Sequence, residues 1–112
     1  MQNIRLIIQK AFEVLESEDY CLIKKHPNFP NLVVGSDLDI FGRNTDQMIS
    51  LLSGCLREYL DDNSRIDVLR SSYGAKVDLV SSDKILLRFD LYKLLPTYKK
   101  VNIKPSFFDV VI

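Results

Sequence analysis

Two aspartates separated by a single residue are the part of this sequence best suited to chemistry. They stand in Asp37-Leu38-Asp39-Ile40, directly after the pair Gly35-Ser36. Because the side chains of a strand alternate between its two faces, Asp37 and Asp39 would share one face, about 7 Å apart at a rise of about 3.3 Å per residue. Carboxylate oxygens are the ligands that Mg²⁺ prefers, and phosphoryl-transfer sites often hold two such ions. The motif predicts a metal site.

Length and composition indicate one compact domain over residues 1–112, with residues 93–112 as a C-terminal extension. The chain has 112 residues, of which 46% are hydrophobic and 27% are charged, enough to form one core. Its 15 basic residues equal its 15 acidic residues, so overall charge gives no strong signal for nucleic-acid binding. The apolar runs are short and the N-terminus lacks the pattern of a signal peptide, so we expect a cytoplasmic protein that does not enter a membrane. Cys21 and Cys55 lie within apolar patterns and are expected to be reduced core residues.

The elements that must position the two aspartates follow from periodicity and turn residues. Apolar residues at three- and four-residue steps predict a helix over Asn3–Ser17, and Asn44 with Gln47 is typical of the N-cap of a second helix that runs to about Leu60. Strands are expected at Tyr20–Ile23, Leu32–Phe41, Arg65–Arg70, Ala75–Val80 and Ile85–Tyr92. The short turns between the last three favour antiparallel hairpins. The predicted fold class is α+β, a nucleotidyltransferase-like small mixed β-sheet packed by two helices.

A third carboxylate would complete a metal site. Asp90 is the first candidate. Its stretch is apolar on both faces apart from Arg88 and Asp90 itself, which predicts a central strand, and an aspartate in a central strand is unusual without a functional or structural role. The alternative for Asp90 is a structural ion pair with Arg88 or Arg70. Asp78 is the reserve candidate, although an edge strand with the carboxylate in solvent is the commoner arrangement for such a residue.

In element order and motif, residues Leu22 to Tyr92 resemble the DNA polymerase beta-type nucleotidyltransferase superfamily. The resemblance implies a Mg²⁺ or Mn²⁺ site made by Asp37, Asp39 and Asp90, which would be both metal ligands and catalytic residues. It further implies transfer of a nucleotidyl group from an NTP to the hydroxyl of an unidentified acceptor. In the superfamily a Gly-Ser pair precedes the aspartates by about ten residues, whereas here Gly35-Ser36 adjoins Asp37. A strand ending in Leu22-Ile23-Lys24 before a proline-containing loop is more similar to a divergent, uncharacterised nucleotidyltransferase-like branch.

Losing the early Gly-Ser pair removes backbone N–H groups that would otherwise bind a triphosphate at a helix N-terminus. Lys24, as a point charge, and Ser36, in the turn before Asp37, are then the candidates for contact with the nucleotide. The same departure leaves a second hypothesis open: a catalytically degenerate domain that binds a nucleotide or a protein, with a role in surface-polysaccharide biosynthesis as one setting. The apolar end of the chain, Phe107–Ile112, is compatible with a homodimer, a missing partner domain or a longer natural chain, and also with docking on the core.

Overall fold

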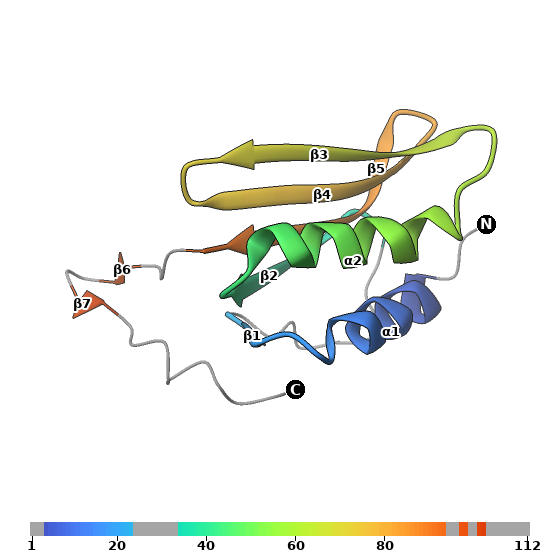
Figure 1. The fold of residues 1–112 in the computed structure, drawn as a ribbon. Coiled ribbons are helices and arrows are strands. Elements are labelled where there is room, and N and C mark those ends of the chain that lie inside the picture. Colours follow the sequence, from blue (N-terminus) through green and yellow to red (C-terminus); the bar gives the residue numbers. More distant parts are fainter. Residues whose placement is uncertain (1–3, 24–33, 94–96, 99–100, 103–112) are drawn as a thin grey trace.

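The computed structural model describes residues 4–23, 34–93, 97–98 and 101–102. Two helices, α1 (Ile4–Leu15) and α2 (Thr45–Arg57), lie against one face of a five-stranded sheet (Figure 1). Its strands are β1 (Tyr20–Leu22), β2 (Ser36–Gly42), β3 (Ser64–Ser71), β4 (Gly74–Ser81) and β5 (Lys84–Tyr92). Two short strands, β6 (Thr97–Tyr98) and β7 (Val101–Asn102), pair separately. This arrangement confirms the predicted α+β class, with a mixed sheet and two helices.

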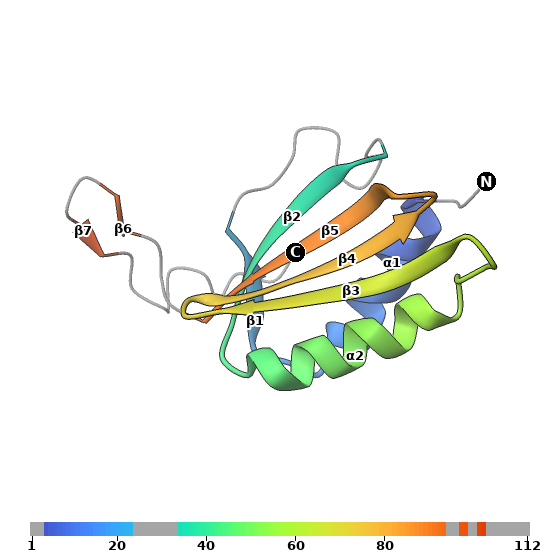
Figure 2. The same cartoon turned by 90° about the horizontal axis from the view of Figure 1, so that it is seen from above.

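The sheet has the order β1-β2-β5-β4-β3, so β5 is its central strand, as predicted. The pair β2·β5 is parallel and the other three pairs are antiparallel. Figure 2 looks onto the sheet with α1 behind it. The chain leaves β2, runs through α2 and the β3–β4 hairpin, and only then adds β5 beside β2. Forty-one residues, 43–83, thus separate the end of β2 at Gly42 from the start of its parallel neighbour β5 at Lys84.

Helix α2 begins where its cap predicts. Asn44 precedes the helix, and its side-chain Oδ1 accepts a hydrogen bond of 3.1 Å from the backbone N–H of Gln47. This satisfies one of the N–H groups that a helix start leaves without a partner. The helix ends at Arg57, a few residues before the predicted end near Leu60. None of the described helices is long and apolar enough to cross a membrane.

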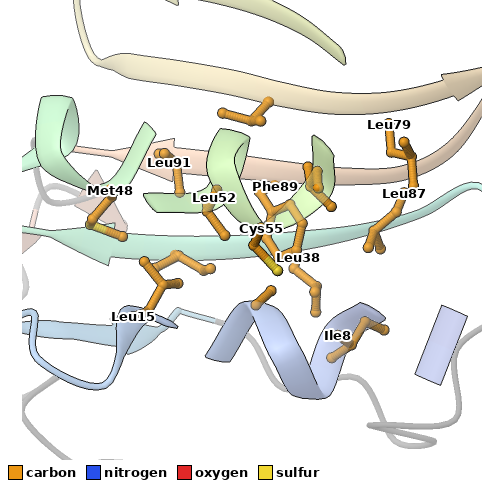
Figure 3. Close-up of a cluster of buried hydrophobic side chains, with 14 of the residues drawn as sticks. Ile8, Leu15, Leu38, Met48, Leu52, Cys55, Leu79, Leu87, Phe89 and Leu91 are labelled. Carbon is orange, nitrogen blue, oxygen red and sulfur yellow. The ribbon is translucent and has the colours of Figure 1, made fainter. Parts of the chain in front are cut away.

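The core lies between the helices and the sheet (Figure 3). On the sheet side, the core is formed by alternate residues of β2 and β5, each at most 1% exposed: Leu38, Ile40, Leu87, Phe89 and Leu91. Helix α2 contributes buried residues at helical spacing, among them Cys55. Cys21 and Cys55 are both free and buried, as predicted. The opposite face of the sheet is therefore the one on which polar side chains of β2 and β5 can gather.

Candidate functional site

The three predicted aspartates share the sheet face opposite the helices. In β2, Leu38 and Ile40 enter the core, which places Asp37 and Asp39 on the other side, Asp37 exposed and Asp39 half-buried. In β5, Phe89 and Leu91 enter the core and place Asp90 on the same outer face. Asp39 and Asp90 are register partners in the parallel pair β2·β5. Their backbones are therefore about 4.8 Å apart, the usual spacing of paired strands.

Asp90 occupies an environment that disfavours its charge. Burial raises the pKa of its carboxyl group, and the nearby carboxylate of Asp39 raises it further, while Lys76 and a hydrogen bond from Tyr92 act in the opposite direction. The hydroxyl of Tyr92 donates that bond to Oδ2 of Asp90 at 3.4 Å, and Oδ1 is buried without a hydrogen-bond partner among the described residues. A buried carboxylate oxygen without a donor is unusual, because such atoms are normally paired.

The structural pairing that could have explained Asp90 is not present in the part of the chain that the structure describes. Arg88 bonds Asp78 instead, through Nε to Oδ1 at 2.8 Å and through Nη2 to Oδ2 at 2.9 Å. Arg70 donates to Asp46, at the start of α2. On the outer face, the register partners of Asp90 are Asp39 in β2 and Lys76 in β4, and Tyr92 donates to it.

The expectation for Asp78 was wrong. It predicted a solvent-facing charge on an edge strand, but β4 lies between β3 and β5, and Asp78 is only 8% exposed. Strand order decides this, because an inner strand has neighbours on both sides that cover an outward side chain. Its bidentate bond to Arg88 is the geometry that matches a guanidinium to a carboxylate. Asp78 is thus occupied as a structural ion pair.

Arg88 lies among the acidic residues of this face. It is the register partner of Asp37 on one side and of Asp78 on the other. The hydrogen bonds to Asp78 raise the pKa of Arg88 most. Burial, the next largest effect, lowers this pKa, and the charges of Asp78, Asp37 and Asp90 raise it. Sequence reasoning considered Arg88 only as a partner of Asp90. The signal available was parity: Arg88, Asp90 and Tyr92 are two residues apart and so share a face.

The two candidates for nucleotide contact are placed differently. Lys24 lies outside the described residues. Ser36 is the first residue of β2 and is half-buried. Strand alternation puts its side chain on the face of Leu38, opposite to Asp37 and Asp39. Gly35 precedes it with a φ of 90°, in the left-handed region that favours glycine, which makes a turn immediately before the strand.

The aspartates lie on an open face of the sheet. The described part of the structure has a pocket of about 260 Å³ at the start of α2, lined by Arg43, Arg70, Lys93 and their neighbours, and none of the three aspartates lines it. Among the described residues no group of three or more His, Cys, Asp or Glu side chains is arranged to hold a metal ion. What the backbone brings together is Asp39 beside Asp90, with Asp37 two residues along the same strand.

Comparisons with known proteins identify no family for this chain. No family model matches the sequence, and no curated protein matches it. Among solved structures, the chain is similar to the crystal structure of the Megavirus polyadenylate synthase, with 17% sequence identity and a TM-score of 0.48. The match covers 86% of this chain and 24% of that chain, so this chain spans about a quarter of that protein's length. At this identity and TM-score the likeness supports no inference about activity.

Proposed function

We propose that this chain is a metal-dependent nucleotidyltransferase domain, in which Asp37, Asp39 and Asp90 form the catalytic site. The observation that carries the proposal is the register of β2 against β5, which sets Asp39 directly beside Asp90 with Asp37 on the same face. Three carboxylates from two adjacent strands could hold the divalent ions that phosphoryl-transfer sites use.

The chemistry of these residues fits Mg²⁺ or Mn²⁺. Asp39 and Asp90 are like charges on neighbouring strands, and Oδ1 of Asp90 is a buried acceptor without a donor among the described residues. Both features would be relieved by a cation bound between the carboxylates. Bound there by Asp37, Asp39 and Asp90, such an ion would supply neutralisation of phosphate charge.

The residues themselves have distinct roles in the proposed reaction. An acceptor hydroxyl attacks the α-phosphorus of an NTP, a new P–O bond forms, and the bond between the α-phosphorus and the bridging oxygen breaks to release pyrophosphate. Asp90, beside Asp39 on the same face, would accept the hydroxyl proton as the general base. Asp37 and Asp39 would hold the cation that neutralises the phosphates.

Thermal melting of the full chain tests the site. We expect Mn²⁺ with ATP to raise the melting temperature of the wild type and to leave that of Asp37→Asn/Asp39→Asn unchanged. The control is Glu16→Gln/Asp62→Asn, which removes the same number of carboxylates from exposed positions outside the sheet and should respond like the wild type. An equal response in the two double variants would refute the site.

A second candidate function is a domain that binds the nucleotide without transferring it. The observation that favours it is the arrangement of the acids, since no metal-holding cluster is already formed among the described side chains. Transfer of label from α-³²P-labelled NTPs to acceptors in a cell extract separates the two. Labelled product that depends on Asp90 supports the enzyme, whereas nucleotide binding without product supports the binding domain.

A further inference from the structure

The outer face of the sheet changes character along its strands. Beyond Asp39 and Asp90, toward the ends of β2 and β5, the side chains on this face are apolar or aromatic. Phe41 and Tyr92 are register partners there, and they pack with Cys21 and Ile23 in a small cluster of their own. The acidic residues therefore border an aromatic region on the same face.

Tyr92 links the two regions. Its hydroxyl donates to Asp90, and its ring stacks on Tyr73, with ring centroids 5.7 Å apart and the ring planes 25° from parallel. Tyr92 is two residues from Asp90, about 7 Å along an extended strand. Tyr73 is 41% exposed. The pair is thus an aromatic surface within reach of the carboxylates.

Tyr73 is held in place by the backbone. It lies in the two-residue turn between β3 and β4, and its carbonyl oxygen accepts a hydrogen bond of 2.8 Å from the N–H of Lys93. Gly74, the next residue, is the register partner of Tyr92. A Cβ at Gly74 would lie 1.7 Å from the carbonyl oxygen of Leu91, so only glycine lets the hairpin approach β5 this closely.

The turn alone does not account for a tyrosine. Tight turns favour Gly, Asn, Asp, Ser and Pro, each for its backbone geometry. The other hairpin of this sheet follows that rule, with Ser82 and Asp83 at φ values of 51° and 63°. A bulky ring at the corresponding place in the β3–β4 turn, stacked on Tyr92 and exposed, is suited to a planar ligand.

We propose that Tyr73, supported by Tyr92, is the surface on which the base of a bound nucleotide stacks. This inference rests on the proposed function, because it needs the phosphates of the same nucleotide at Asp37, Asp39 and Asp90. The sugar would then span the interval between Asp90 and Tyr92. Stacking recognises the flat face of a base and tolerates different bases, since each has such a face.

Calorimetric titration separates the base from the phosphates. In the presence of Mg²⁺, we expect the wild type to bind ATP more tightly than inorganic tripolyphosphate, by on the order of ten-fold, the effect of one stacked base. Tyr73→Ser should bind the two ligands equally, with its tripolyphosphate affinity unchanged. Tyr73→Phe should restore the preference for ATP, because it keeps the ring. Leu69→Ser, which replaces another exposed apolar side chain of the same hairpin, is the matched control and should retain the preference.

Each other outcome decides against one proposal or both. Equal binding of ATP and tripolyphosphate by the wild type, or ATP binding by Tyr73→Ser at wild-type strength, overturns the stacking surface and leaves the carboxylate site standing. A preference for ATP that depends on Tyr73, with tripolyphosphate binding unaffected by Asp37→Asn/Asp39→Asn, overturns the catalytic site and, with it, the inference in this form, because Tyr73 then stacks a base whose phosphates lie elsewhere. Absence of binding by the folded wild type, with its melting curve intact, overturns both.

Discussion

The ion pair between Arg88 and Asp78 should contribute measurably to stability, and Arg88→Met tests this. The replacement keeps much of the aliphatic stem but leaves the carboxylate of Asp78, whose side chain is 12% exposed, without its two charged donors. It also leaves Asp37, Asp39, Asp78 and Asp90 on one face, where Lys76 is the register partner of Asp90.

The size of the effect follows from the geometry. Removing one partner of a fully buried pair costs about 3–5 kcal/mol. The Arg88 side chain is 26% exposed, so water can partly solvate the vacated space, and we expect a loss of about 2–3 kcal/mol in the free energy of unfolding. For a domain of this size that corresponds to a fall in melting temperature on the order of 10–20 °C. Urea denaturation, read as the shift in midpoint at constant slope, measures it.

Two comparisons make the result interpretable. Arg65→Met removes an arginine that is paired with Asp67 and Asp83 at the exposed edge strand, and it should leave the midpoint nearly unchanged because solvent screens such pairs. The double variant Asp78→Leu/Arg88→Met should recover most of the loss, since no lone charge remains. If Arg88→Met destabilises the protein no more than Arg65→Met does, the reasoning about this pair is wrong.

Three further predictions concern the site and the elements that support it. Asp90→Asn should raise the free energy of unfolding at pH 7 by about 1 kcal/mol, because it removes a charge next to an unpaired buried oxygen. A raised carboxyl pKa favours the protonated form in the folded chain, so the contribution of Asp90 to stability is complete below its ordinary value of 3.8 and is lost as the pH rises through the folded value. Melting curves between pH 3.5 and 8, buffered within that span, should therefore show a loss in the wild type that Asp90→Asn lacks, and a less stable Asn variant would mean that a partner holds the carboxylate. Gly74→Ala should cost about 3 kcal/mol because its Cβ would collide with the backbone of Leu91, whereas Gly54→Ala, in open space on α2, should gain about 0.5–1 kcal/mol; equal melting temperatures would contradict the close approach. Asn44→Ala should cost about 1 kcal/mol through loss of the cap, and Asn44→Asp should not; chemical denaturation measures both, and similar losses would show that the cap contributes little.

Sequence patterns predicted the elements that are fixed by interactions between residues close together in the chain. Helix α2 starts at its capping residue because the first turn of a helix brings the side chain of a residue such as Asn44 within hydrogen-bond distance of the N–H three residues later, here that of Gln47. The central position of β5 was predictable because its sequence is apolar on both faces apart from Arg88 and Asp90. The start of β2 was predicted at Leu32 and is observed at Ser36, after the turn at Gly35; residues 24–33 lie outside the description.

The sequence by itself determined which residues face which way, because strand alternation is a property of the local backbone: Asp37 with Asp39, and Arg88 with Asp90 and Tyr92. The short turns also indicated the hairpins that place β4 between β3 and β5 and bring Asp78 to Arg88. Only the tertiary structure decided that β2 is the parallel neighbour of β5, which brings Asp39 beside Asp90. That pairing joins residues far apart in the chain, and it depends on how the helices and the hairpins pack together, which no local spacing records.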